Sequence, residues 1–302
     1  MSNSTQFTRQ VASDGPAKGK TFTGRRNAVV TQEGNPGHDL PLVIAIHGGG
    51  FTSAYFDVPG YSLLDRAESA GVPLIAIDRP AYGGSDPVAS DGSVFAANAA
   101  ALDHLVSELW ADHGAGRAGV FVIGHSIGAS ITLALAARQP AWPLRGIAIS
   151  GCLLREPESV VDWFASIRTE EFAVSAEEKA GVMFGPEGTY RPDMPHASNF
   201  ANVPVLAAEL IEASSQWEKQ YRVLAPKISV PVHIRQGEFD ALWINDETQV
   251  TEFAAALTGS PWVDAELFRS AGHAIDFHRG GAALQLQQLA FALTTCTRRT
   301  AS

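Results

Sequence analysis

The chain has 302 residues, of which 45% are hydrophobic, and it carries a formal net charge of −10. This length suits one large domain or two small ones, and the apolar content can fill a sizeable core. The acidic balance and the lack of basic runs exclude nucleic acid and anionic membranes as expected partners.

The cysteines and the apolar stretches bear on the compartment. Cys152 and Cys296 stand far apart, which favours a reducing compartment over a disulfide scaffold. Residues 119–137 are apolar for about the length of a membrane span, but His125 and Ser126 interrupt them within a glycine-rich turn. Because the first residues also lack the apolar segment of a signal peptide, we expect a cytoplasmic protein without a transmembrane segment.

Residues 1–20 are polar, and we expect a flexible tail there. Within it, residues 14–21 nearly match a phosphate-binding P-loop, but Asp14 stands where glycine is needed and no strand precedes it, so we reject nucleotide binding. Short strands over 21–24 and 27–32 are expected to form an antiparallel edge before a turn at 34–37.

Strand-like and helix-like patterns then alternate along the chain. Four continuous apolar runs are typical of strands buried on both faces of a parallel sheet: 42–46, 72–78, 119–123 and 144–150. Helical patterns follow three of them: 61–70, 93–113 and 126–138. The alternation resumes near the end of the chain, with strands at 230–236 and 264–270 and helices at 247–257 and 281–295. It predicts an α/β fold with a parallel sheet and helices on both faces.

Residues 152–227 interrupt this alternation and contain no strand-like run. They show helical signals instead, with a capping-box pattern at 175–178 and an amphipathic stretch over 204–224. Large apolar side chains are frequent here: Trp163, Phe164, Phe172, Met183, Phe184, Phe200, Trp217 and Tyr221. We expect a helical lid over 152–227 that lines an apolar pocket, inserted in a core of 21–151 and 228–302.

A Gly-X-Ser-X-Gly motif, residues 124–128, stands where an apolar strand gives way to an alanine-rich helix. In that context the serine lies on a tight strand-to-helix turn with its hydroxyl exposed at the carboxyl end of the strand. The flanking glycines allow strand and helix to pack closely at this strained turn. The motif predicts Ser126 as a catalytic nucleophile.

A serine hydroxyl needs a general base, and the base needs an acid that orients it. His273 and Asp240 follow strands directly, and the chain order Ser126, Asp240, His273 is the order of this nucleophile-elbow architecture. His278 is the nearest rival for the base. The rivals for the acid are Glu238, Asp246 and Asp276, of which Asp246 suits a helix cap. A zinc site of His273, Asp276 and His278 matches no common ligand spacing, so we expect no metal.

The tetrahedral oxyanion of acyl transfer needs N–H donors already in place. One is expected from Ile127, the residue after the nucleophile, and the other from the loop His47-Gly48-Gly49-Gly50. We favour Gly49, with Gly50 as the alternative. Asp78 also ends a strand, but its Asp-Arg-Pro context suggests that it fixes its loop through Arg79 or the backbone. The expected substrate-pocket residues are Phe51, His125, Trp163, Phe184, Trp217 and Trp243.

Together these motifs resemble the α/β-hydrolase superfamily, and the resemblance runs from about residue 21 to 295. It rests on residues 47–50, the Asp-Arg-Pro-Ala-Tyr-Gly-Gly-Ser loop at 78–85, the elbow at Ser126, and the segments 237–240 and 272–273. It implies an eight-stranded, mostly parallel sheet with a helical cap after the sixth strand. It also implies a Ser126-His273-Asp240 triad that needs no cofactor.

The expected function is hydrolysis of a carboxylic ester, thioester or lactone of an apolar small molecule through an acyl-enzyme. A serine at the elbow disfavours the epoxide-hydrolase and dehalogenase branches, which use aspartate there. Carbon-carbon bond hydrolysis and cofactor-free perhydrolase chemistry remain alternatives on the same fold. A non-catalytic ligand-binding protein on a hydrolase fold is a third possibility.

Overall fold

The structure of the protein is a computed structural model that describes residues 4–31 and 40–297. Its centre is an eight-stranded sheet in the order β1-β2-β4-β3-β5-β6-β9-β10. The strands from β4 to β10 pair in parallel, whereas β1 with β2 and β2 with β4 pair antiparallel. The strands are β1 (Thr5–Gln10), β2 (Thr21–Arg26), β3 (Pro41–Ile46), β4 (Leu74–Ile77), β5 (Gly119–His125), β6 (Leu144–Ser150), β9 (Val232–Gly237) and β10 (Val263–Phe268). The predicted mostly parallel α/β sheet is confirmed.

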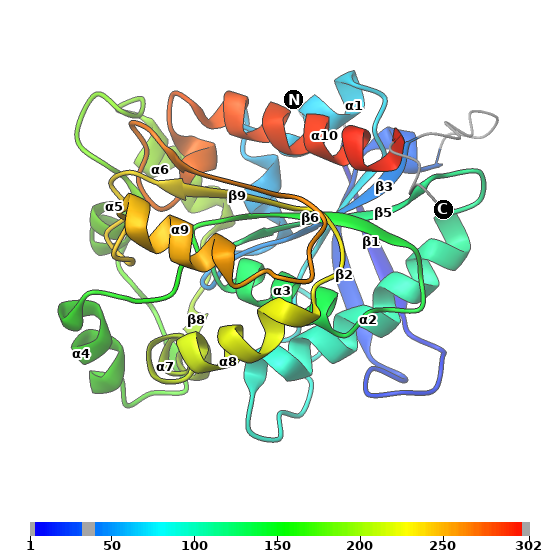
Figure 1. The fold of residues 1–302 in the computed structure, drawn as a ribbon, viewed down its shortest axis with the longest axis horizontal. Coiled ribbons are helices and arrows are strands. Elements are labelled where there is room, and N and C mark those ends of the chain that lie inside the picture. The colour runs from blue at the N-terminus through cyan, green and yellow to red at the C-terminus, as the bar shows by residue number, and fades with distance from the viewer. Residues whose placement is uncertain (1–3, 32–39, 298–302) are drawn as a thin grey trace.

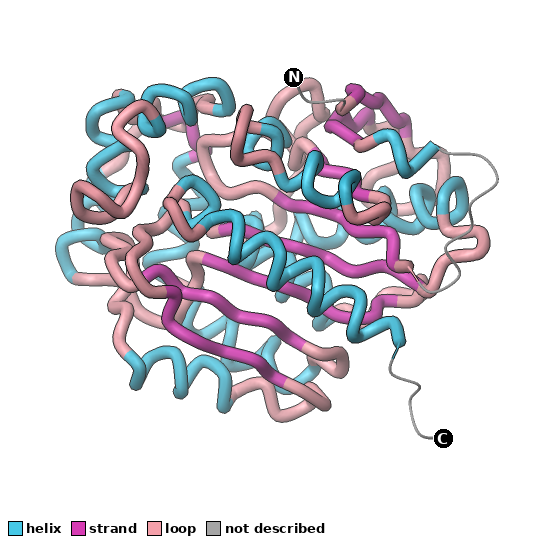
Figure 2. The backbone as a smooth tube through the Cα atoms, turned by 90° about the horizontal axis from the view of Figure 1, so that it is seen from above, coloured by secondary structure: helices cyan, strands magenta, loops and turns pink. Residues whose placement is uncertain are grey.

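Helices cover both faces of this sheet, which explains the continuous apolar runs. In β3, Leu42, Ile44 and Ile46 pack on one face, while Val43 and Ala45 belong to the core on the other. The first face is covered by α2 (Val94–His113), α3 (Ile127–Ala137) and α9 (Glu247–Ala255), and the second by α1 (Leu63–Ser69) and α10 (Gly281–Thr297). Figure 2 shows α10 lying over the sheet, roughly along the direction of the strands.

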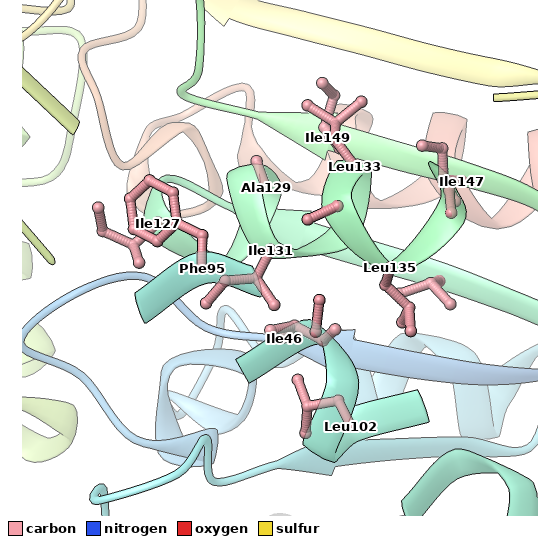
Figure 3. Packing of buried hydrophobic residues seen from close by; sticks show 14 of the residues in the cluster. Ile46, Phe95, Leu102, Ile127, Ala129, Ile131, Leu133, Leu135, Ile147 and Ile149 are labelled. Atoms are coloured by element: carbon pink, nitrogen blue, oxygen red, sulfur yellow. The ribbon is translucent and has the colours of Figure 1, made fainter. Parts of the chain in front are cut away.

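Helix α3 holds the central position of the first face. Ten of its eleven residues, from Ile127 to Ala136, are buried, which accounts for the alanine-rich composition of the segment. Figure 3 shows Ile131 and Leu135 of this helix between the strands and Phe95 and Leu102 of α2. The helix that follows Ser126 is therefore held on all sides by packing.

The expected flexible tail is wrong for the described part of residues 1–20. Thr5–Gln10 forms the edge strand β1, and the ring of Phe7 is buried against the sheet. Arg9 pairs with Glu108 of α2 at 2.9 Å. The other oxygen of that carboxylate accepts the backbone N–H groups of residues 12 and 13. A single inward apolar residue in a polar strand leaves little pattern in the sequence, so its pairing with β2 was not predicted.

The second strand expected at this edge is also wrong. Residues Ala28–Thr31 form a 3-10 helix, because the side chain of Asn27 turns the chain by bonding to the backbone of Val72 and Leu74. Gln32 and the turn expected at 34–37 lie outside the described residues. Six strands still precede residue 152, because the unexpected strand β1 replaces the strand predicted over 27–32.

The segment from 152 to 227, called the insertion below, follows β6 and precedes β9, as expected. Most of its helices gather beyond the end of the sheet shown on the left of Figure 1. The amphipathic stretch predicted over 204–224 is two helices, because the chain breaks at Gln216. Contrary to the prediction, two-residue strands β7 and β8 pair antiparallel within it. The elements are α4 (Glu158–Ser166), β7 (Glu171–Phe172), α5 (Ala176–Met183), α6 (Met194–Ser198), β8 (Val205–Leu206), α7 (Ala207–Ser215) and α8 (Trp217–Leu224).

Two predicted helix caps and the predicted division of one apolar stretch are confirmed. Ser175 and Glu178 form the capping box of α5, and Asp246 caps α9 by accepting the N–H of Gln249 at 2.7 Å. The apolar stretch 119–137 divides into β5 and α3 at Ser126. Within the described ranges, none of the helices combines the length and the apolarity needed to cross a bilayer. The thiols of both cysteines are free.

Candidate active site

Three parallel strands bring the three predicted catalytic residues together. Ser126 follows β5 directly, Asp240 comes three residues after β9, and His273 comes five residues after β10. Because the carboxyl ends of parallel strands meet at one edge of the sheet, residues 147 positions apart in the sequence become neighbours. The strand order alone therefore accounts for their proximity.

Ser126 has a strained backbone, with φ 55° and ψ −124°. This region is rarely occupied by residues other than glycine, and such strain is concentrated at functional sites. A Cβ atom at Gly124 would lie 2.5 Å from the carbonyl oxygen of Gly128, and one at Gly128 would lie 2.2 Å from that of Ile46. Both glycines are thus required by close packing, and the side chain of Ser126 is half-buried at the turn.

A chain of hydrogen bonds links the three side chains. The Nε2 atom of His273 lies 2.8 Å from Oγ of Ser126, and its Nδ1 atom lies 2.7 Å from Oδ2 of Asp240. A carboxylate only accepts hydrogen bonds, so Nδ1 carries the proton and Nε2 is free to accept the serine proton. Asp240 is itself fixed by Gln236 at 2.7 Å and by the backbone N–H of Leu242 at 2.9 Å.

The rival acids and base have other partners. His278 accepts the N–H groups of Gly272 and Gly185 at Nε2, and its Nδ1 faces the carbonyl of Ala274. Asp276 accepts the hydroxyl of Tyr55 and the amide of Gln285.

Glu238 pairs with Arg269 and accepts the N–H of Ser270. Within the described ranges, no group of three His, Cys, Asp or Glu side chains could hold a metal ion. The rival residues therefore serve structure, each through its own hydrogen bonds.

The glycine-rich loop lies directly against Ser126. A Cβ atom on Gly48 would lie 3.0 Å from Cβ of Ser126, and Gly50 has φ 69°. His47 anchors the loop: its Nε2 atom accepts the N–H of Arg79 at 3.0 Å, and its Nδ1 atom lies 2.8 Å from the carbonyl oxygen of Gly48. Burial, reinforced by the charge of Arg79, holds the pKa of His47 well below its usual value and keeps the ring neutral.

Arg79 joins this loop to the insertion. Its guanidinium donates to the carbonyl oxygens of His47 and Gly48 and forms an ion pair with Glu209 of α7, in which both side chains are 0% exposed. The hydroxyl of Tyr82 donates to the same carboxylate at 2.7 Å. The loop 78–85 therefore ties the sheet edge to the insertion through one buried charge pair.

Asp78 does not pair with Arg79, which was one of the two partners suggested for it. Its carboxylate accepts the backbone N–H of Ser53 at 2.7 Å and the hydroxyl of Thr23 at 2.6 Å. The expected structural role in fixing the loop is thus filled through the backbone and a neighbouring strand. The partner of Arg79 lies 130 residues away, and no local pattern indicates it.

A pocket of about 260 Å³ opens between the glycine loop and the insertion. Its lining is mostly apolar and includes Gly49, Gly50, Trp163, Phe164, Phe172, Val174, Lys179, Val182, Met183, Asn202, Val205, Leu210 and Leu242. Of the six predicted pocket residues, the structure places Trp163 in this lining. Gly49 connects the pocket to the surroundings of Ser126.

The other five predicted pocket residues lie elsewhere. Trp217 and Trp243 are buried and donate their indole N–H groups to the carbonyls of Leu153 and Gly151. His125 stacks on Tyr55 beneath the site, with ring centroids 4.7 Å apart.

Phe51 and Phe184 line a separate, smaller cavity at the base of α5. Lys179 and Leu242 are among the pocket residues that the sequence prediction missed. Leu242 could have been found from its position two residues after Asp240, whereas Lys179 left no signal.

Comparison with known proteins agrees with this geometry. A family model described as the alpha/beta hydrolase family matches residues 43–284. A thermophilic esterase from Thermogutta terrifontis in a malate-bound form is 17% identical, with a TM-score of 0.67 over 97% of this chain and 100% of its own. A loop variant of a haloalkane dehalogenase from Bradyrhizobium elkanii is 17% identical, with a TM-score of 0.64 over 97% and 98%.

A thioesterase domain from the curacin biosynthetic pathway is 18% identical, with a TM-score of 0.61 over 95% of this chain and 99% of its own. No curated protein sequence matches the chain. At these identities the structural likeness establishes the fold, and the family model covers more than half of the residues. The chain belongs to the α/β-hydrolase family.

Proposed function

We propose that the protein is a serine hydrolase that cleaves a carboxylic ester of an apolar small molecule through an acyl-enzyme. The observation that carries this proposal is the hydrogen-bonded chain from Asp240 through His273 to Ser126. The half-buried hydroxyl of Ser126 lies on a strained backbone turn, 2.8 Å from an imidazole nitrogen. This is the arrangement that activates a serine nucleophile.

In the first half of the reaction, Oγ of Ser126 attacks the ester carbonyl carbon while Nε2 of His273 takes its proton. The tetrahedral oxyanion accepts hydrogen bonds from the N–H groups of Ile127 and Gly49. The N–H of Ile127 is available because it belongs to the first turn of α3, where no helical partner exists. When the carbon-oxygen bond of the ester breaks, His273 returns the proton to the departing alcohol.

In the second half, a water molecule attacks the acyl-enzyme and gives its proton to His273. The same two N–H groups hold the second oxyanion, and the proton passes back to Oγ of Ser126 as the carboxylic acid leaves. Asp240 orients His273 and stabilises the imidazolium that forms in each half. The cycle consumes one water, releases an alcohol and an acid, and needs no cofactor.

The insertion takes the part of a lid in this proposal. Side chains of α4, β7 and α5 form the apolar wall of the pocket that reaches Gly49, which suits an apolar acyl or alcohol group. Thioesters and lactones present the same electrophilic carbonyl to Ser126, and an ester, thioester and lactone panel ranks them. We place the protein in the cytoplasm, where its two free thiols are compatible with a reducing environment.

A fluorophosphonate probe tests the assignment of Ser126. We expect the probe to label the wild type and to leave Ser126→Ala unlabelled, with hydrolysis of activated esters lost in parallel. Ser130→Ala is the matched control, because this buried serine of α3 contacts the thiol of Cys152 and should leave labelling intact. Equal labelling of the wild type and Ser126→Ala would overturn the proposal.

A further inference from the structure

Among the described residues, a single charged side chain lines the otherwise apolar pocket. Lys179 of α5 is 8% exposed, and its ammonium lies 3.7 Å from the centroid of the Phe51 ring. It donates one hydrogen bond, to the carbonyl oxygen of Gly50 at 2.6 Å. Among the described residues that line the pocket, Asn202 is the other one with a polar side chain.

Lys179 lacks a counter-ion among the residues that the structure describes. In the part of the chain that the structure describes, no carboxylate stands at ion-pairing distance from it, and burial lowers its pKa to about 7. An ammonium has three donors, so two remain after the bond to Gly50. Glu209 also lies near the loop, but Arg79 and Tyr82 already hold its carboxylate. A buried, unpaired cation facing a cavity is strongly stabilised by an anion that enters it.

Lys179 also lies close to the reaction centre. Its Nζ atom is 3.3 Å from the place that a Cβ atom of Gly50 would take, and Gly50 directly follows Gly49, the proposed oxyanion donor. Consecutive Cα atoms are about 3.8 Å apart. A substrate group in contact with Lys179 would therefore be only a few bonds from the carbonyl held at Gly49.

We propose that Lys179 recognises a carboxylate on the acyl side of the substrate, so that half-esters of short dicarboxylic acids are preferred over neutral esters. The apolar walls around Trp163 and Leu210 then receive the alcohol group. This inference rests on the proposed ester hydrolysis at Ser126, and it confines the apolar part of the substrate to the alcohol group. The competing explanation is that Lys179 only ties α5 to the loop at Gly50.

Two esters of equal chain length separate these explanations: an aryl half-ester of glutaric acid, which is anionic, and the aryl ester of pentanoic acid, which is neutral. The quantity to measure is the ratio of their kcat/KM values. A charge-assisted hydrogen bond contributes about 1.5–3 kcal/mol, so Lys179→Met should lower this ratio about 10- to 150-fold. Lys179→Arg should restore most of it.

Lys219→Met is the matched control, because Lys219 is an exposed residue of α8 outside this pocket, and it should leave the ratio unchanged. A structural tie would slow both esters alike in Lys179→Met and leave the ratio at its wild-type value, which would overturn the inference. Should Lys179→Met fail to fold, Lys179→Gln removes the charge while keeping a donor for Gly50.

Calorimetric binding of glutarate to Ser126→Ala, with and without Lys179→Met, gives a readout that does not depend on catalysis. We expect at least about tenfold weaker binding without the lysine. If the wild type hydrolyses neither ester, the proposed function fails, while this binding measurement still decides the anion site. If the neutral ester is hydrolysed but glutarate binding is the same in both proteins, the anion site alone is wrong.

Discussion

The sheet edge and the insertion fix their residues in different ways. At the edge, Ser126, Asp240 and His273 each follow the end of a paired strand by at most five residues, so the register of the sheet positions them. In the insertion, the contacts that matter join distant segments, such as Glu209 with Arg79 and Lys179 with Gly50, about 130 positions apart. Short motifs therefore reveal the residues proposed for the chemistry, whereas the selectivity proposed for the insertion depends on tertiary packing.

The strongest test of the edge is Asp240→Asn. An amide at this position can donate to Nδ1 of His273, which would place the proton on Nε2 and remove the base that Ser126 needs. We expect kcat to fall about 10⁴-fold. Steady-state kinetics on an activated ester measures this effect, with circular dichroism as a check on folding.

Asp246→Asn is the control for this change, since Asp246 lies six residues further along and caps α9. Asparagine is an equally good cap, so activity and stability should stay near wild type. A loss of less than about tenfold in Asp240→Asn would show that the His273–Asp240 contact has no catalytic role.

The junction between the two regions is tested by Glu209→Gln. This change leaves Arg79 charged and buried with its counter-ion removed, and breaking a buried pair in this way costs about 3–5 kcal/mol of unfolding free energy. Urea denaturation measures the loss. Glu252→Gln is the matched control. Glu252 pairs with Arg155 and Arg222 at the surface, where solvent screens the charges, so the loss should be much smaller. Equal losses would mean that the buried pair does not hold the insertion to the sheet.

The sequence could predict the sheet, the elbow and the three catalytic candidates because their signals are local: an apolar run, a glycine beside a serine, a polar residue after a strand. The pocket was harder, because Trp217 and Trp243 look like pocket residues by size alone. Their indole N–H groups donate hydrogen bonds to backbone carbonyls, so both tryptophans belong to the core. The edge strand β1 was missed for a similar reason, since only Phe7 marks its buried face.

Replacing a glycine by alanine should change the free energy of unfolding in opposite directions in the two regions. In Gly128→Ala of α3, the new methyl group would lie 2.2 Å from the carbonyl oxygen of Ile46. Overpacking of this kind typically destabilises a protein by about 1–3 kcal/mol. In Gly181→Ala of α5, the methyl group meets no atom of the described residues within 4 Å, and the helix should gain about 0.5–1 kcal/mol. Unfolding free energies of both variants measure the difference. Destabilisation by Gly181→Ala would mean that α5 packs more tightly than the structure shows.

The two regions should also differ in how pH changes their contribution to the free energy of unfolding. In the sheet, burial lowers the pKa of His233 to about 3. The unfolded chain therefore binds a proton below its ordinary pKa of about 6.5 while the folded chain does not, and stability falls as pH drops from there toward 3, by at most about 1.4 kcal/mol per pH unit.

In the insertion, Lys179 has a pKa of about 7 in the folded chain and a higher one when unfolded, so its contribution to stability rises with pH above 7. We therefore measure the free energy of unfolding in urea from pH 5 to 9. It should change less with pH on the acid side in His233→Leu, and less on the alkaline side in Lys179→Met, than in the wild type. Burial raises the pKa of the Glu156 carboxyl to about 8, so this residue lowers stability as the pH rises. Its effect is the same in the wild type and in both variants, so it cancels when the unfolding free energy of each variant is compared with that of the wild type. If unfolding free energy depended on pH in the same way in the wild type and both variants, neither side chain would be shielded from water. That result would contradict the proposed difference between the buried histidine of the sheet and the buried lysine of the insertion.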